Sequence, residues 1–186
     1  MAQSSTKYIG ISGGWRKITP NIEKKVRLVV KKAMQNDKGI VSGGALNVDY
    51  VALNEALKHN PSATRIKIFL PTTLKKYTQH YRKHAKLKTI TVKQANDLIK
   101  QLSDLKKTNP RALIECPNEN FTEATKKDMY YKRNSRAVEA TDELVAFHIK
   151  TKESEGAGTM DTISKAKAKG IPVKIFSFDF TKQHKC

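Results

Sequence analysis

Three short glycine-containing segments have the residue types needed to bind a phosphate. They are Ser12-Gly13-Gly14, Ser42-Gly43-Gly44-Ala45 and Gly156-Ala157-Gly158-Thr159. Glycine lets backbone N–H groups approach a phosphate closely, and the helix that follows such a turn adds the partial positive charge of its N-terminus. The three segments therefore predict a site for a phosphate-bearing ligand. The alternative is that they are only tight turns between strands and helices.

The segments around these turns alternate between apolar strands and amphipathic helices. Strands are expected at 7–12, 39–42, 65–70, 143–148 and 172–176, and helices at 20–36, 48–57, 122–140 and 160–169. Near-continuous apolar strands separated by helices are typical of a parallel sheet covered on both faces. In such sheets ligands bind outside the carboxyl ends of the strands, which is where the glycine turns fall. We therefore predict an α/β fold, a modified Rossmann-like three-layer sandwich with a mainly parallel sheet, forming a single domain over 1–186.

Residues 72–120 interrupt this alternation and predict a basic, partly helical insertion. Ten Lys or Arg and only two Asp or Glu lie between Pro71 and Lys107, and tyrosines are interleaved with the cations. Cations that hold phosphates beside rings that stack on bases would suit single-stranded nucleic acid. The alternative is a solvated helix whose tyrosines point inward. The candidate nucleic-acid contacts are Lys75, Lys76, Tyr77, Tyr81, Arg82 and Lys83.

The overall charge is strongly positive. The chain has 36 Lys and Arg against 17 Asp and Glu, a formal net charge of +19. This excess favours polyanionic partners such as nucleotides or nucleic acid, although a lysine-rich proteome would produce it too. No apolar run approaches the roughly 20 residues that span a bilayer, and residues 1–7 lack the apolar core of a signal peptide. We expect a cytoplasmic protein with no membrane contact, no metal site, and free thiols at Cys116 and Cys186.

Four segments, in order, resemble the SLOG superfamily, which includes the DNA-processing protein A family and the LOG phosphoribohydrolases. Ser42-Gly43-Gly44-Ala45-Leu46-Asn47-Val48-Asp49 resembles the signature S-G-G-A-x-G-[VI]-D, with Asn47 in place of a glycine. The other three matches are Arg133-Asn134 with 140–145, the second phosphate loop at 155–162, and the strand entry at 170–173. Only about 72–120 lies outside the resemblance.

The resemblance implies a nucleotide- or nucleic-acid-binding protein that holds phosphates at its glycine turns, and it implies a homodimer. No cofactor is expected beyond a phosphorylated nucleotide. Asp49 could bond a ribose hydroxyl or fix its loop, and Trp15 could stack on a base or anchor its loop by burial. The implied ligand contacts are Ser12, Gly13, Gly14, Ser42, Gly43, Gly44, Asp49, Arg133, Asn134, Gly156, Gly158, Thr159 and Thr162.

Two other functions remain open. In a LOG-like phosphoribohydrolase, the resemblance makes Asp161 and Arg133 the catalytic residues, with Asp161 where those enzymes have a glutamate. A carboxylate can stabilise the oxocarbenium character of a breaking N-glycosidic bond, and an arginine can hold the 5′-phosphate. Otherwise Arg133 is only a phosphate anchor, and Asp161 only complements a helix dipole. The other function is that of a carrier for a phosphorylated cofactor.

Overall fold

The computed structural model describes residues 6–117 and 120–181, so the predicted thiol of Cys186 lies outside the described residues. Its centre is one six-stranded sheet, in which every pairing is parallel and the strand order is β4-β3-β2-β1-β5-β6. The strands are β1 (Tyr8–Gly13), β2 (Gly39–Ser42), β3 (Ile66–Phe69), β4 (Leu113–Ile114), β5 (Glu143–Lys150) and β6 (Val173–Asp179). The predicted Rossmann-like α/β sandwich is confirmed.

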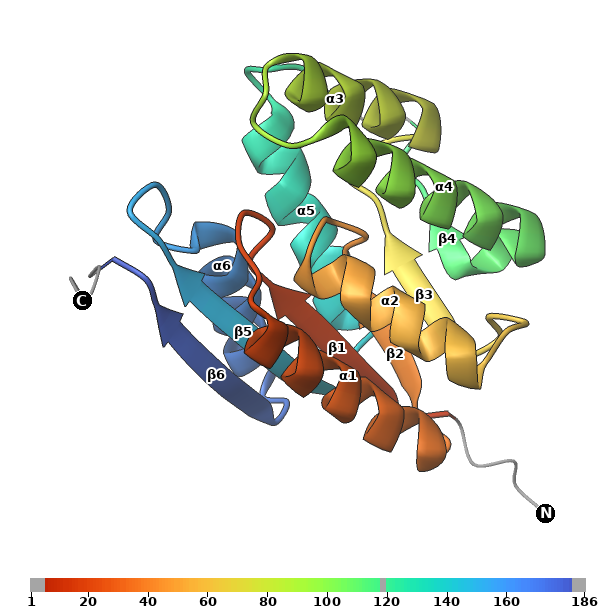
Figure 1. Ribbon diagram of the computed structural model, residues 1–186. Helices are drawn as coiled ribbons and strands as arrows, with labels where there is room; N and C mark the ends of the chain where they lie inside the picture. Colours follow the sequence, from red (N-terminus) through yellow and green to blue (C-terminus); the bar gives the residue numbers. More distant parts are fainter. Residues whose placement is uncertain (1–5, 118–119, 182–186) are drawn as a thin grey trace.

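Helices cover both faces of the sheet (Figure 1). One face carries α1 (Pro20–Gln35) and α2 (Val48–His59), and the other carries α5 (Lys126–Glu139) and α6 (Ala157–Lys169). Every residue of β2 is buried, which explains why its sequence is a continuous apolar run without alternation. The third pair, α3 (Leu74–Lys86) and α4 (Val92–Thr108), lies at the β4 end of the sheet, above the carboxyl ends of its strands (Figure 1).

Local sequence signals set the helix starts. The Thr19 side chain accepts a hydrogen bond from the Ile22 N–H, and Pro20 follows as the first helical residue of α1. A capping box between Thr91 and Gln94 opens α4. Helix α6 begins at Ala157, three residues earlier than expected, and its N-cap Gly156 adopts a φ of 74° that glycine tolerates. The third glycine segment is therefore the start of a helix.

The 72–120 insertion is attached to the core by its own packing. Leu98, Leu102 and Leu105 of α4 are fully buried, and β4 extends the sheet by pairing with β3. Tyr77 and Tyr81 of α3 are 1% and 4% exposed, and the Tyr77 hydroxyl donates to the Gly44 carbonyl at 3.3 Å. The expectation that these two rings form an exposed stacking surface is wrong, because the apolar face of α3 turns them toward the core.

The described helices show no membrane-spanning segment, since none is both long enough and apolar enough. Among the described residues, no group of three or more His, Cys, Asp or Glu side chains is placed so that it could bind a metal ion.

Candidate functional site

A cavity of about 440 Å³ opens at the carboxyl ends of β1, β2 and β5. The strand order reverses between β1 and β5, which is the position where open α/β sheets bind ligands. All three glycine segments contribute to its lining, so the structure brings together what the sequence places far apart. Of the expected ligand contacts, the lining residues are Ser12, Gly13, Gly14, Ser42, Gly43, Asp49, Arg133, Asn134, Gly156, Gly158, Thr159 and Thr162.

The first glycine turn is held by the start of α2. A Cβ atom on Gly13 would lie 2.6 Å from the Val48 side chain, so only glycine permits this approach. The Asn47 side-chain amide donates to the Trp15 carbonyl at 2.5 Å. Asn47 itself has a φ of 62° and a ψ of −105°, a positive-φ conformation that favours glycine. Its side chain adds a hydrogen bond that links this position to the first turn.

The second glycine turn packs against Arg133 of α5. The Arg133 guanidinium donates to the Gly43 carbonyl, and a Cβ on Gly43 would overlap that guanidinium. Asp49 is buried in the first turn of α2, and its Oδ2 accepts from the Ala45 N–H at 3.2 Å. Burial raises the pKa of the Asp49 carboxyl, and the charge of Arg133 opposes that rise. Asp49 thus fixes its own loop, one of the two roles that the sequence left open.

Three buried polar atoms at this turn make no hydrogen bond of ordinary geometry to the described residues, although the Ser42 side chain lies close enough to the Asp49 carboxyl to lower its pKa. They are Ser42 Oγ, Asp49 Oδ1 and Arg133 Nε, and all three residues line the cavity. An unpartnered buried polar group costs about 1–3 kcal/mol, so such groups normally bind something. This cavity floor offers hydroxyl, carboxylate and guanidinium groups, a set suited to the hydroxyls and phosphate of a nucleotide.

The third glycine segment presents the N-terminus of α6 to the cavity. Within the described ranges, the structure gives the N–H groups of Ala157 and Gly158 no hydrogen-bond partner, and α6 has no side-chain cap. Gly158 is exposed, and a Cβ on it would meet nothing within 4 Å. Thr162 Oγ1 donates to the Gly158 carbonyl at 3.1 Å and steadies this turn. Free N–H groups and the helix dipole together suit an anion.

Asp161 does not lie where a catalytic partner of Arg133 should. Its Oδ2 accepts from Asn134 Nδ2 at 2.9 Å and from Lys165 Nζ at 2.7 Å, between α5 and α6. Asp161 is absent from the cavity lining, whereas Arg133 and Asn134 belong to it. The geometry therefore gives no support to Asp161 and Arg133 as a catalytic pair.

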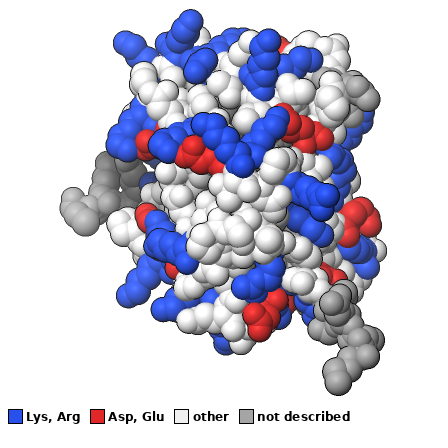
Figure 2. Space-filling view, turned by 90° about the vertical axis from the view of Figure 1, so that its right-hand side faces the viewer, with Lys and Arg blue, Asp and Glu red and all other residues white. Residues whose placement is uncertain are grey.

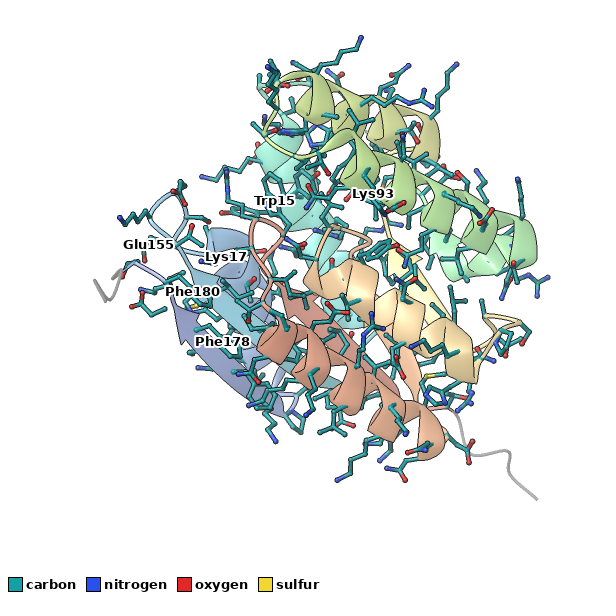
Figure 3. The ribbon with its side chains drawn as sticks, viewed as in Figure 1. Trp15, Lys17, Lys93, Glu155, Phe178 and Phe180 are labelled. Carbon is teal, nitrogen blue, oxygen red and sulfur yellow. The ribbon has the colours of Figure 1, made fainter. Side chains whose placement is uncertain are left out.

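The cavity lining is cationic apart from Asp49. Its charged side chains are those of Arg16, Lys17, Lys126, Lys127, Arg133 and Asp49. Figure 3 shows Trp15 at the tip of the β1–α1 loop, turned toward the α3–α4 pair, with Lys17 near Phe180. The Lys17 ammonium lies 4.2 Å from the centre of the Phe180 ring.

Ring side chains from α3 and α5 complete the lining, and of these the sequence analysis named only Tyr81. His80, His84 and Tyr130 line the cavity together with Tyr81. The i,i+4 spacing of His80 and His84, one helical turn apart on α3, was the available signal. It could not be used without knowing which face of α3 meets the sheet.

The basic residues of the insertion lie outside this cavity. Lys75, Lys76, Arg82 and Lys83 are exposed on α3, and Lys83 pairs with Glu123 at 2.9 Å. On α4, Lys93 pairs with Asp97 and Lys100 with Asp104. Figure 2 shows the face of the molecule that carries α4, with Lys and Arg spread over it and Asp and Glu beside many of them. Many of these charged side chains therefore lie in solvent, where they pair with neighbouring carboxylates.

A Rossmann-like domain with a glycine-lined cavity at the reversal of strand order is the class of protein that this fold and site define. No family model and no curated protein matches the sequence. Among solved structures the chain is similar to DNA processing protein A from Helicobacter pylori, with 18% identity, a TM-score of 0.61, and coverage of 96% of this chain and 67% of that one. The Helicobacter pylori structure was reported for the way in which that protein binds single-stranded DNA.

Two further structures have the same fold. DNA processing protein A from Streptococcus pneumoniae matches with 18% identity and a TM-score of 0.59 over 97% of this chain, which spans 52% of that protein's length. The molybdenum cofactor binding protein from Rippkaea orientalis matches with 16% identity and a TM-score of 0.57, covering 95% of this chain and 80% of that one. At these identities the similarities show a shared fold, and it is the Rossmann-like fold that the sequence predicts.

Proposed function

We propose that this protein binds a nucleotide, free or as a residue of a single strand, with its phosphate at the N-terminus of α6. The observation that carries the proposal is the set of unpartnered polar groups at one cavity. The N–H groups of Ala157 and Gly158 lie at one end, and the orphaned atoms of Ser42, Asp49 and Arg133 form the floor. The volume of about 440 Å³ lies within the 300–1,000 Å³ typical of small-molecule sites.

The phosphate position follows from electrostatics. The α6 N-terminus carries about half a positive charge, and Arg16, Lys17, Lys126 and Lys127 add their charges around the cavity. Asp49, the one carboxylate in the lining, is buried beneath the second glycine turn beside Arg133. The electrostatic potential at the cavity therefore attracts an anion such as a phosphate. The polar groups of Ser42, Asp49 and Arg133 would then bind the sugar hydroxyls.

One similar structure supports the single-stranded form of the ligand, and another supports a different ligand, a cofactor. The Helicobacter pylori protein binds single-stranded DNA, and the Rippkaea orientalis protein binds the molybdenum cofactor. A phosphorylated cofactor is the second candidate ligand, favoured by that last similarity alone.

Substitution of Gly158 tests the phosphate position directly. Gly158→Asp places a negative charge in the first turn of α6, where the dipole accommodates it and the fold stays intact, but where it repels a phosphate. Gly158→Ala is the matched control, because its Cβ enters open space. By isothermal titration calorimetry with the four nucleoside 5′-monophosphates and a thymidine oligonucleotide, we expect Gly158→Asp to bind at least tenfold more weakly and Gly158→Ala to bind as the unmodified protein does.

Two results would contradict the proposal. Equal affinities of the Gly158→Asp variant and the unmodified protein would show that the α6 N-terminus holds no phosphate. Absence of any binding by the unmodified protein, to monophosphates and oligonucleotide alike, would remove the proposed function altogether.

A further inference from the structure

Aromatic and imidazole rings form a wall on the side of the cavity that faces α3 and α5. The Trp15 and His84 ring centres are 5.7 Å apart, and those of His84 and His80 are 4.5 Å apart, both pairs edge to face. His80 in turn lies 6.3 Å from Tyr130. All four residues line the cavity. We call Trp15, His80, His84 and Tyr130 the ring wall.

The ring wall is supported from behind and from the side. Tyr77 and Tyr81 are buried on the same face of α3, and the Tyr81 ring centre lies 5.6 Å from that of His80. The Asn47 side-chain amide donates a hydrogen bond to the Trp15 carbonyl. The Arg16 guanidinium lies 4.8 Å from the centre of the Trp15 ring. Trp15, His80 and His84 are themselves only half-buried, so they keep ring surface for a ligand.

Burial favours the neutral form of both imidazoles. Burial lowers the pKa of His80 to about 4, helped by the nearby His84, Lys126 and Lys83 and opposed by Glu123. Burial also lowers the pKa of His84, and the positive charge of Lys126 adds to the effect. A neutral imidazole carries one N–H donor and one acceptor nitrogen. Within the described ranges, His80 has no hydrogen-bond partner, so both of its ring nitrogens remain available to a ligand.

The ring wall and the α6 N-terminus line one cavity. The wall is built on α3, α5 and the β1–α1 loop, whereas α6 packs against β5 on the face of the sheet that also carries α5 (Figure 1). Ser42, Asp49 and Arg133 belong to the second glycine turn, α2 and α5, and the Arg133 guanidinium lies 5.4 Å from the centre of the Tyr130 ring of the wall. One cavity is thus lined by anion-binding N–H groups, polar side chains and rings, the three kinds of group that would bind the phosphate, sugar and base of a nucleotide.

We propose that the ring wall is a base subsite, in which a nucleobase stacks on Trp15 and exchanges hydrogen bonds with His80 and His84. This inference rests on the proposed nucleotide binding and adds that the protein recognises an aromatic base as well as a phosphate. The ligand class is therefore a base-bearing nucleotide, and a sugar phosphate alone fills only part of the site.

The test compares each nucleoside 5′-monophosphate with ribose 5-phosphate by isothermal titration calorimetry. We expect at least one monophosphate to bind about tenfold or more tightly than ribose 5-phosphate, which is the order of effect that base–ring stacking gives. Trp15→Ala and His80→Ala should each lower the affinity for that monophosphate several-fold, leaving the affinity for ribose 5-phosphate unchanged. Trp15→Phe should retain most of the difference, and His59→Ala, a histidine that contacts Glu55 on α2, should change nothing.

The chain supplies a second readout, because Trp15 is its only tryptophan. The monophosphate should change the intrinsic tryptophan fluorescence and ribose 5-phosphate should not. Equal affinity for monophosphates and ribose 5-phosphate, with no change in fluorescence, would overturn the base subsite and leave the phosphate site standing. Failure of both ligands to bind would overturn the proposed function itself, so the two failures are distinguishable.

Discussion

The carboxylate of Asp161 accepts two hydrogen bonds, one from Asn134 that joins α5 to α6 and one from Lys165 one turn along α6. Its side chain is 19% exposed and that of Lys165 is 29% exposed, so the ion pair is largely sheltered from solvent. Sequence comparison alone places Asp161 at a catalytic position, because it follows the third glycine segment at the right spacing. The helical phase of α6 turns the side chain toward α5 instead, which a linear motif does not reveal.

Asp161→Asn is expected to leave ligand binding within about twofold of the unmodified protein, because the carboxylate does not line the cavity. The variant should lose up to about 1 kcal/mol of stability through the weakened pair with Lys165. Calorimetric titration and thermal unfolding measure the two effects. If the unmodified protein releases free base from a nucleoside monophosphate and Asp161→Asn abolishes that release, Asp161 is catalytic and our reading of the site is wrong.

His80 predicts a pH dependence of stability. Its pKa is about 4 in the folded protein, against about 6.5 when unfolded, so the unfolded chain binds the proton more readily. The contribution of His80 to stability is therefore fully present above pH 6.5 and declines as the pH falls toward 4. Urea unfolding at several pH values should show this decline, and His80→Gln should reduce it. An unchanged slope between pH 6.5 and 4 in the variant would assign the dependence to other groups.

Each glycine turn is an element that joins a strand to a helix, and each was predictable from local sequence. Strand patterns end at these glycines, and parallel topology then places all three turns at the same edge of the sheet. The orientation of α3 was not predictable in this way. Its tyrosines and cations alternate along the chain, and only packing against the Gly44 turn and α5 decides that Tyr77 points inward. The ring wall was missed for the same reason.

Gly43→Ala should disrupt both the second glycine turn and the contact that Arg133 makes with it. The added Cβ overlaps the guanidinium, so either the turn or α5 must move, and overpacking of this kind costs typically 1–3 kcal/mol. We expect a lower midpoint of urea unfolding and a loss of nucleotide affinity of tenfold or more. Gly158→Ala adds the same methyl group into open space and should show neither effect. A Gly43→Ala variant with normal stability and binding would show that the Arg133 contact is dispensable.

At the scale of the whole molecule, β6 is the last strand of the sheet formed by the described residues. This strand pairs with β5 on one side, Ile175 is 40% exposed, and Phe176 and Phe178 are half-buried. An exposed apolar edge is a common site of pairing with another chain. The homodimer expected from the resemblance therefore has a candidate interface at β6.

Light scattering at micromolar concentration should give the mass of a dimer. Ile175→Lys should shift the protein toward the monomer, and Val92→Lys, at a 64% exposed position on α4, should not. A monomer in the unmodified protein would refute the prediction.

The parallel pairing of β1 with β5 has a consequence for folding. Ile9 pairs with Glu143, so neighbouring strands of the sheet come from opposite ends of the chain. The cavity needs β1 and β2 from the first part of the chain and α5 and α6 from the last. Contacts of such long sequence separation form slowly, because the closure of a long loop must precede them. The cavity is therefore complete only after α6 has left the ribosome during synthesis, so binding of the proposed nucleotide by a nascent chain would report completed folding.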